Sequence, residues 1–454
     1  MDYEKFLDRK THVGAKHGFE PTFMPEDLYP FQIDLTTWAI RKGRAAIFAD
    51  CGLGKTLMQL VWAQNVVEHT NKRVLILTPL AVSFQTVKEA EKFGIDIAHR
   101  RDEIHSNDRI VVTNYEKLSH FSSNDFVAAV CDESSILKNY DGATRKDITD
   151  FMRKLPYRLL CTATAAPNDY IELGTSSEAL GELGYADMLS RFFKKAEKTY
   201  SRKYEHMSGI YRFRGHAKDN FWRWVCSWSR AVRRPSDLGY DNNGFELPLL
   251  NIVSHIVEAR TKPDGFLFNL PAVNLQEQRD ELRRTINERC ELVADLINAH
   301  NGPAIAWCHL NTESAKIKQM IPDAIEVNGS DSDKHKEESF IGFADGSIRV
   351  LVTKPSIAGF GLNWQHCAHQ TFFPSHSYEQ YYQAVRRSWR FGQKNEVKVD
   401  IVSTEGQRRV FENLQRKSKA ADLMFEKLTL FMRNELNIKK HNPYTKQEEV
   451  PEWL

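Results

Sequence analysis

The sequence predicts an α/β protein in which two lobes each enclose a parallel sheet. The chain has 454 residues, which is too long for one hydrophobic core and indicates two or three domains. Short, continuous apolar runs alternate with helical patterns between residues 44 and 161, and the same alternation returns after residue 302. Runs of this kind are typical of parallel strands that helices cover on both faces.

A glycine-bearing turn at residues 50–56 is the first predicted functional element. An apolar run at residues 45–48 stops at this turn, and a helical pattern follows it. The turn fits the phosphate-loop pattern G-x-x-x-x-G-K-[ST] except that Ala49 stands at the first glycine position. Loop amides would surround phosphates, the lysine would reach the terminal phosphates and the threonine would ligate Mg²⁺. The predicted nucleotide-binding residues are Gly52, Leu53, Gly54, Lys55 and Thr56, although an ordinary glycine turn is an equal alternative for the motif alone.

Polar residues follow the next predicted strands of this half. Runs at residues 74–77 and 110–113 end at Thr78 and at Thr113, and ligands gather at the carboxyl ends of parallel strands.

Ahead of the phosphate loop, Gln32 begins a predicted helix. Its amide can read the edge of adenine, or the segment is simply a helix start.

Two adjacent acids end the fourth predicted strand, at residues 127–131. Burying such acids is costly unless they meet a cation, so we expect Asp132 to hold Mg²⁺ and Glu133 to activate water. The alternative is that Asp132 caps the next helix. A fifth strand at residues 158–161 delivers Thr162 and Thr164, which either sense a phosphate or start a turn.

A basic and aromatic segment separates the two halves. Residues 190–235 carry thirteen Lys or Arg against three acids, whereas the whole chain has a net charge of only +2, so the positive charge is concentrated here. Arg212, Arg214 and Arg223 are the candidates for phosphate contacts. The alternative is an insertion with an aromatic core and a solvated basic exterior, and both descriptions can hold together.

The second half predicts a helical stretch at residues 275–300 and five strands, at residues 304–307, 325–327, 350–352, 371–373 and 397–402. It has no intact phosphate loop. It supplies Arg387 and Arg390, which on a helix would project from one face and suit the oxygens of a transferring phosphoryl group. A surface helix can show the same spacing by chance.

Together these segments resemble superfamily 2 helicases. Residues 50–56, residues 132–135 with Lys138 and Asn139, and residues 162–168 resemble motifs I, II and III, and residues 30–32 resemble the Q motif. Residues 383–393 are similar to motif VI of Swi/Snf-like proteins, and Thr353, Gly361 and Asn363 to motif V. The closest resemblance is to Swi/Snf-like DNA translocases, in particular to the short bacteriophage and prophage versions. Ser134-Ser135 and the alanines at 163, 165 and 166 depart from the family pattern.

The resemblance implies two RecA-like lobes that bind ATP and Mg²⁺ in the cleft between them and move along double-stranded DNA. In this assignment Gln32 reads adenine, Lys55 holds phosphates, and Arg387 with Arg390 stabilises the developing charge. Coupling to nucleic acid would involve the strand-end threonines, Thr353, Gly361, Asn363 and the three basic-segment arginines. A strand-separating DNA or RNA helicase and an ATP-gated clamp with little turnover are the alternatives.

The expected domain boundaries are an arm at 1–27, lobe 1 at 28–186, an insertion at 187–274, lobe 2 at 275–433 and a tail at 434–454. No apolar run reaches membrane-spanning length and the first residues do not resemble a signal peptide, so we expect a cytoplasmic protein. Seven scattered cysteines without a C-x-x-C spacing predict reduced, mostly buried thiols.

Overall fold

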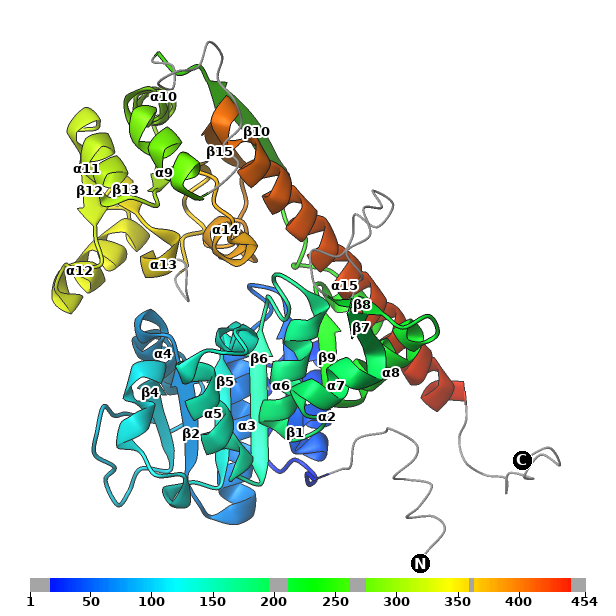
Figure 1. Cartoon of the computed structure of the whole chain (residues 1–454). Helices are drawn as coiled ribbons and strands as arrows, with labels where there is room; N and C mark the ends of the chain where they lie inside the picture. The colour runs from blue at the N-terminus through cyan, green and yellow to red at the C-terminus, as the bar shows by residue number, and fades with distance from the viewer. Residues whose placement is uncertain (1–16, 196–210, 261–274, 359–362, 442–454) are drawn as a thin grey trace, which may run out of the picture.

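The computed structural model describes residues 17–195, 211–260, 275–358 and 363–441. These residues form two α/β lobes, drawn one above the other in Figure 1, with a long helix running along both. Gly361, part of the predicted motif V, lies outside the described residues.

Lobe 1 contains a seven-stranded sheet in the order β3-β4-β2-β5-β6-β1-β9. All neighbouring strands are parallel. The strands are β1 (Arg44–Ala49), β2 (Val74–Thr78), β3 (Ala98–His99), β4 (Ile110–Asn114), β5 (Ala128–Asp132), β6 (Tyr157–Thr162) and β9 (Ser229–Val232). The five strands predicted for this half are present, each within about two residues of its predicted bounds.

Helices cover both faces of this sheet because successive strand residues point to opposite sides. Ala45 and Ile47 of β1 pack with one group of buried side chains, and Ala46 and Phe48 pack with another. The first face is covered by α2 (Pro30–Lys42), α3 (Lys55–Thr70) and α4 (Ser83–Lys92). The second is covered by α5 (Ala143–Arg153), α6 (Leu173–Leu180), α7 (Tyr185–Phe192) and α8 (Ala217–Trp228).

The expected boundary of lobe 1 at residue 186 is wrong, because β9 pairs with β1 and extends the sheet to Val232. The preceding segment forms the hairpin of β7 (Phe193–Lys195) and β8 (Tyr211–Phe213), followed by α8. Aromatic side chains of α8 are buried, and Trp228 contacts Phe48 of β1 with ring centroids 6.1 Å apart. This burial of apolar area attaches the segment to lobe 1.

Lobe 2 contains a six-stranded parallel sheet in the order β10-β15-β14-β11-β13-β12. Its strands are β10 (Leu250–Val257), β11 (Ala304–Trp307), β12 (Ala324–Val327), β13 (Val350–Thr353), β14 (His369–Phe372) and β15 (Val397–Thr404). Its helices are α9 (Leu275–Arg284), α10 (Ile286–Asn298), α11 (Asn311–Met320), α12 (Asp333–Ala344), α13 (Pro355–Ala358) and α14 (Tyr378–Val385). The sheet begins with β10, so the expected lobe 2 boundary at residue 275 is also wrong. Together the two sheets confirm the predicted α/β class with two parallel-sheet lobes.

Helix α15 (Arg408–His441) joins the two lobes. Leu414, near its start, packs against Tyr378 of lobe 2, whereas Met424 and Leu428 belong to the buried core of lobe 1. Because the helix continues to His441, the tail expected from residue 434 begins later than predicted.

Short 3₁₀ segments complete the described secondary structure: η1 (Leu80–Val82), η2 (Tyr115–His120), η3 (Ser123–Asp125), η4 (Ser134–Lys138), η5 (Tyr170–Glu172), η6 (Pro235–Leu238) and η7 (Glu405–Gln407).

Residues 17–27 are part of lobe 1 and not of a loose arm, which corrects the predicted N-terminal boundary. The His17 N–H donates to the Lys42 carbonyl at 3.0 Å, and the Phe19 ring stacks on His69 with centroids 3.9 Å apart. The Asn65 side chain bonds the Phe23 backbone through both its oxygen and its nitrogen.

All seven cysteines are buried free thiols, as predicted. Across the described ranges, no helix combines the length and apolar character needed to cross a membrane.

Candidate functional site

The phosphate-loop residues lie between β1 and α3, and their glycines are required by the backbone. Gly52 has φ of 87° and Gly54 has φ of 77°, values in the left-handed region that favours glycine. A Cβ at Gly52 would lie 2.9 Å from the Phe391 backbone nitrogen of lobe 2, and one at Gly54 would overlap the Gln32 amide. The loop is therefore packed against both α2 and lobe 2.

Lys55 lies across the loop that it follows. Its Nζ donates to the Ala49 carbonyl at 2.9 Å and to the Asp50 carbonyl at 3.2 Å. Asp50 is itself held by a backbone bond from its N–H to the Val232 carbonyl at 2.9 Å. The Lys55 ammonium therefore lies beside the loop, whose amides surround an anion in proteins that carry this motif.

The acid pair lies at the carboxyl end of β5, and both carboxylates are buried. The Gln59 amide donates to Asp132 Oδ1 at 2.6 Å, and the Thr162 hydroxyl donates to Glu133 Oε2 at 3.2 Å. Burial, and then the charge of Glu133, raises the pKa of Asp132 to about 6. The alternative role of Asp132 as a helix cap is wrong, since Glu133 occupies the cap position of η4 and makes no side-chain cap bond.

The arginines of lobe 2 reach the cleft from a turn and not from a helix. Helix α14 ends at Val385, after which the backbone turns: the Arg387 N–H donates to the Ala384 carbonyl at 3.1 Å and the Arg390 N–H donates to the Ser388 carbonyl at 3.0 Å. The expectation that Arg387 and Arg390 share a helix face is therefore wrong. Burial, with the charge of Arg387 next in size, lowers the pKa of Arg390 to about 10, and burial also lowers the pKa of Arg387.

One cavity of about 320 Å³ brings the predicted residues of both lobes together. Lobe 1 contributes Gln32, Gly52, Gly54, Lys55, Thr56, Asp132 and Glu133, and lobe 2 contributes Asn363, Gln365, Arg387, Arg390 and Phe391. Leu53 does not line the cavity, but its carbonyl accepts a bond from the Gln32 Nε2 at 3.0 Å. Residues that lie more than 300 positions apart in the sequence therefore face one space.

The Gln32 amide is partly engaged within the chain. Its Oε1 accepts from the Tyr29 N–H at 3.0 Å, so one donor and one acceptor position of the amide remain beyond its two bonds. Aromatic rings of the same cavity lie nearby: Phe245 stacks on Phe391 with centroids 4.7 Å apart and meets Tyr29 edge-on at 4.8 Å.

The threonines predicted to couple the site to nucleic acid are buried. Thr78, Thr113 and Thr353 are each at most 1% exposed, and the Thr353 hydroxyl donates to the Val327 carbonyl at 3.0 Å. Thr162 lies beside Glu133, and the Thr164 N–H donates to the Thr162 hydroxyl at 3.0 Å. Of these side chains Thr162 contacts the acid pair and Thr353 bonds within the lobe 2 sheet, and none of the five forms an open surface.

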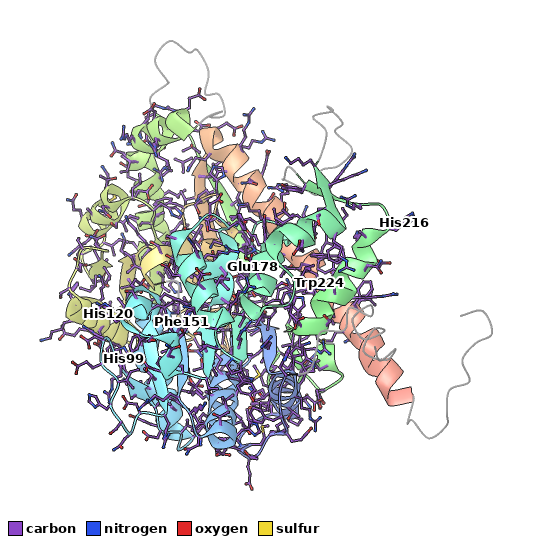
Figure 2. All side chains as sticks on the ribbon, turned by 60° about the horizontal axis from the view of Figure 1, so that its bottom comes forward. His99, His120, Phe151, Glu178, His216 and Trp224 are labelled. Atoms are coloured by element: carbon purple, nitrogen blue, oxygen red, sulfur yellow. The ribbon has the colours of Figure 1, made fainter. Side chains whose placement is uncertain are left out.

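In the basic segment, the aromatic side chains of α8 are mostly buried, whereas the three candidate arginines are exposed. Phe221, Trp222, Trp224 and Trp228 are buried, which supports the aromatic-core alternative for the rings of α8. Arg212, Arg214 and Arg223 are exposed, and the segment reaches the edge of the molecule at His216 in Figure 2. None of the three arginines lines the cleft cavity.

Sequence reasoning missed several cleft residues. Phe391 and Arg386 lie within the predicted motif VI and Asp50 within the predicted phosphate loop, so the motifs themselves pointed to them. Phe245 has no such signal, because it comes from the segment that links β9 to β10.

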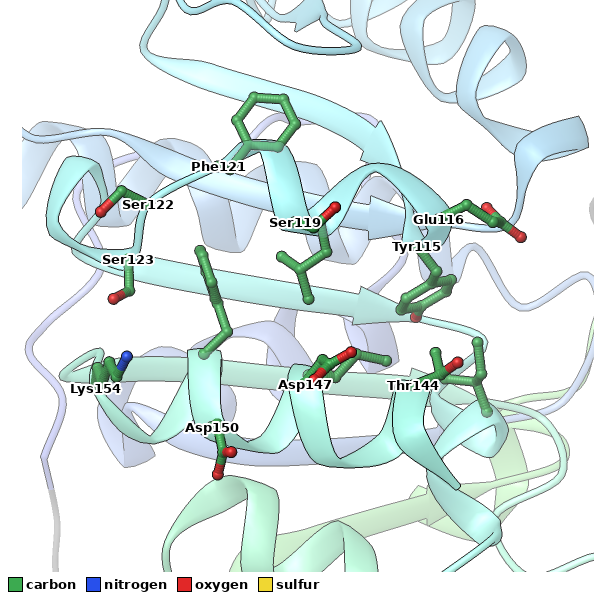
Figure 3. A pocket seen from close by; sticks show the side chains of 14 residues that line it. Tyr115, Glu116, Ser119, Phe121, Ser122, Ser123, Thr144, Asp147, Asp150 and Lys154 are labelled. Atoms are coloured by element: carbon green, nitrogen blue, oxygen red, sulfur yellow. The ribbon is translucent and has the colours of Figure 1, made fainter. Parts of the chain in front are cut away.

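A second cavity, of about 610 Å³, lies outside this site. Figure 3 shows α5 forming one wall with Thr144, Asp147 and Asp150, and η2 forming another with Tyr115 and Glu116. None of the residues predicted to bind nucleotide or Mg²⁺ lines it.

The cleft supplies two oxygen donors, Asp132 and Thr56, that fit a magnesium ion. Within the described ranges no cluster of three or more His, Cys, Asp or Glu is arranged to hold a metal. Mg²⁺ in phosphoryl-transfer sites needs only one or two protein oxygens beside phosphates and water. Asp132 is a buried acid of raised pKa, and Thr56 lines the same cavity, so both donors are appropriate.

Comparisons with known proteins give no sequence relative: no family model and no curated protein matches the chain. Among solved structures, the chain is similar to Dbp5 of S. cerevisiae bound to RNA and ADP BeF3, at 12% identity and a TM-score of 0.54, covering 88% of this chain and 98% of that one. It also aligns with the Sulfolobus solfataricus SWI2/SNF2 ATPase core in complex with dsDNA, at 15% identity and a TM-score of 0.40, covering 93% and 97%. The Dbp5 likeness shows the fold alone, two RecA-like α/β lobes that each enclose a parallel sheet.

Proposed function

We propose that this chain is an ATP-dependent nucleic-acid motor that hydrolyses ATP in the cleft between its lobes. The observation that carries the proposal is the cavity lined by Lys55, Thr56 and the acid pair of lobe 1 together with Arg387 and Arg390 of lobe 2. Loop, metal ligand, water-activating carboxylate and arginines are the parts that phosphoanhydride hydrolysis requires.

In this proposal lobe 1 binds the nucleotide and prepares the water. Gln32 reads adenine with its remaining donor and acceptor, and Lys55 leaves the loop carbonyls to hold the terminal phosphates. Glu133 orients the attacking water and accepts its proton, and Thr162 fixes the Glu133 carboxylate. Thr56 and Asp132 would hold Mg²⁺, which neutralises charge on the phosphate oxygens when it is bound.

Lobe 2 completes the site. Arg387 and Arg390 stabilise the charge that develops on the transferring phosphoryl group, so hydrolysis depends on the position of lobe 2 relative to lobe 1. Alternation between closed and open lobes would move the chain along a nucleic-acid backbone. The RNA and the ADP BeF3 bound to Dbp5 are ligands of that protein, and they agree with such a role for this fold.

The specific motor that we propose is a double-stranded DNA translocase of the short, bacteriophage-type Swi/Snf-like group, acting in the cytoplasm. The motif VI string and the motif I and II residues support this assignment through their resemblance to that family. The exposed Arg212, Arg214 and Arg223 would contact the DNA backbone.

The test is the ATPase rate with no nucleic acid, with single-stranded DNA, with duplex DNA and with RNA. We expect the largest stimulation by duplex DNA, and displacement of a triplex strand without unwinding of a tailed duplex. Preferential stimulation by a single strand together with unwinding would indicate a helicase, and tight binding without turnover would indicate an ATP-gated clamp.

Glu133→Gln is the matched control for turnover. This variant keeps the size of the side chain and replaces the basic carboxylate with a neutral amide, so it should bind ATP with Mg²⁺ yet hydrolyse it at least ~10²-fold more slowly. A rate within about twofold of wild type would contradict the assigned role, since a positioned base contributes far more.

A further inference from the structure

A buried ion pair joins the two lobes beside the phosphate loop. We infer that Asp50, Tyr382 and Arg386 position the neighbouring Arg387 and Arg390 against the phosphate loop, so that the proposed hydrolysis depends on this inter-lobe contact. The inference rests on the proposed function for its kinetic consequence, but the contact itself is defined by geometry alone.

The contact is centred on the Asp50 carboxylate of lobe 1. One oxygen pairs with the Arg386 guanidinium, and the other accepts from the Tyr382 hydroxyl and from the Cys51 N–H, the latter at 2.6 Å. Arg386 also approaches the Cys51 carbonyl at 3.5 Å. Lobe 2 is therefore bonded to the backbone that begins the loop.

Burial and aromatic contacts define the geometry of Arg386. The side chains of Arg386 and Asp50 are 3% and 11% exposed. The guanidinium lies over the Trp389 ring at 4.7 Å and near the Tyr382 ring at 5.7 Å, contacts that favour a cation. A side chain held by stacking and by a carboxylate has little freedom, and it fixes the backbone to which Arg387 belongs.

The electrostatics favour a true ion pair. Burial alone would raise the pKa of Asp50, but the charge of Arg386 and the Tyr382 hydrogen bond outweigh it and hold this pKa below its usual value. Burial would lower the pKa of Arg386, and the charge of Asp50 instead raises it. Three arginines lie close together in this turn, so the Asp50 charge offsets repulsion within the cluster.

Other polar contacts between the lobes are more open to solvent. Lys138, which pairs with Glu379, has 32% of its side chain exposed. Lys417 of α15 donates to the Asn168 side chain at a partly buried position and to the exposed His376 carbonyl, both at 2.7 Å. Exposed pairs contribute little because water competes for them, whereas removing one partner of a buried pair leaves an uncompensated charge and is costly. The Asp50 contact is therefore the one that sets lobe position at the phosphates.

A kinetic double-mutant cycle tests the inference. Arg386→Gln leaves Asp50 buried without its counterion, and Asp50→Asn does the same to Arg386. Each variant should lower kcat ~10²-fold, the loss expected from a displacement of about 1 Å at the reacting groups, while the Kd for ATP changes little. Arg386→Lys should recover only part of the rate, because an ammonium lacks the planar fork.

The double variant separates positioning from simple damage. Asp50→Asn with Arg386→Gln leaves no unpaired charge, so its loss should stay near ~10²-fold and not reach the product of the single effects, since contacting residues are not additive. Losses that multiply would overturn the inference, as would an Arg386→Gln variant with an unchanged kcat.

Lobe position can be measured without any turnover. All seven native cysteines are buried, so Lys72→Cys in lobe 1 and Lys318→Cys in lobe 2, both at exposed positions, accept a donor and an acceptor dye selectively. We expect each single-charge variant to change the energy transfer between the dyes. Unchanged transfer in both would contradict the inter-lobe role, even if the protein proved not to hydrolyse ATP.

Two control variants accompany these measurements. Arg289→Gln breaks the Arg289–Glu313 pair, which is equally buried but lies wholly within lobe 2, and it should lower the stability of that lobe without moving the dyes apart. Arg349→Gln breaks an exposed pair within lobe 2 and should change neither readout. A dye response to Arg289→Gln equal to that of Arg386→Gln would assign the effect to unfolding of lobe 2.

Discussion

The two lobes share a structural feature, a helix that follows a parallel strand, but they differ in what lies at the start of that helix. In lobe 1, β1 leads through the glycine loop to α3, and the helix start faces a cavity. In lobe 2, β11 leads to α11, and the chain's own Glu313 accepts from the His309 and Leu310 N–H groups, both at 3.0 Å. Glu313 is fully buried and pairs with Arg289.

A helix N-terminus attracts an anion through its free N–H groups and its dipole. No side chain caps the start of α3 in lobe 1, whereas lobe 2 places a carboxylate of its own at the start of α11. Under the proposed function, the uncapped start of α3 receives the phosphates of the nucleotide, and lobe 2 contributes arginines in place of a second phosphate loop. If lobe 1 binds the nucleotide and lobe 2 supplies only the arginines, changes in the two lobes should have different effects.

The largest expected effect is at Arg390. Arg390→Ala should keep nucleotide affinity, which depends on lobe 1, but lower ATP turnover by ~10³-fold or more, the usual worth of such an arginine. Arg390→Lys should recover little of the rate. The loss should appear with and without DNA, in steady-state ATPase assays paired with nucleotide titrations.

Normal hydrolysis by Arg390→Ala together with failure to bind DNA would break the comparison. Arg390 would then belong to the nucleic-acid surface, and the catalytic arginine of lobe 2 would have to be Arg387 or Arg386.

The role of the Glu313 carboxylate at the turn between β11 and α11 can be tested by Glu313→Gln. This change leaves Arg289 buried without its carboxylate, and breaking one partner of a buried pair costs about 3–5 kcal/mol. Hydrogen exchange of the β11 and α11 peptides, or urea unfolding, measures the loss. Arg349→Gln at an exposed pair provides the reference, for which the change should be below about 1 kcal/mol.

Asp400 makes lobe 2 sensitive to acid. Burial alone would raise the pKa of Asp400, but hydrogen bonds from His369, His255 and Lys398 hold it well below the ordinary value of about 3.9. A carboxyl group whose pKa is lower in the folded than in the unfolded chain stabilises the fold fully at pH values above the unfolded pKa. This stabilisation is lost progressively as the pH falls below about 4. Asp400→Asn should thus destabilise lobe 2 by about 2 kcal/mol near neutral pH. The difference in the free energy of unfolding between this variant and wild type should become smaller below about pH 4. A difference that does not change with pH would contradict the stabilising ionisation of Asp400.

The smallest expected effect is at the basic surface of lobe 1. Charge reversal of Arg212, Arg214 and Arg223 together should weaken duplex DNA binding and flatten its dependence on salt by roughly 1 unit of slope per lost phosphate contact. Reversal of Arg283, Lys318 and Lys334, which are exposed on lobe 2, serves as the control. Equal affinities and slopes for both triple variants would identify the segment as a solvated exterior.

The sequence predicts most of lobe 1 and the residues of its site because these features are local. Continuous apolar runs identify β1, β2, β4, β5 and β6, and the glycines and acids directly follow them in the chain. Strand β9 has only four residues and includes an arginine, so no apolar run marks it. Its place beside β1 depends on the buried aromatic face of α8.

Features that depend on distant contacts could not be predicted. Helix α14 ends before Arg387, and the turn that follows is bonded to Trp364, a contact that helical spacing in the sequence cannot show. The same holds for the pairing of Asp50 with Arg386, since these residues lie in different lobes. Phe245 is held at the cavity by ring contacts with Tyr29, Phe31 and Phe391, which are distant from it in the sequence.

The most direct test of one site built by two lobes is trapping of ADP with aluminium fluoride and Mg²⁺, which mimics the transferring phosphoryl group. Wild type should release the trapped nucleotide far more slowly than ADP alone. Lys55→Ala should bind neither form tightly, because lobe 1 has lost its phosphate ligand. Arg390→Ala should bind ADP normally yet release the trapped complex as fast as ADP. Slow release from Arg390→Ala, equal to that of wild type, would contradict the account.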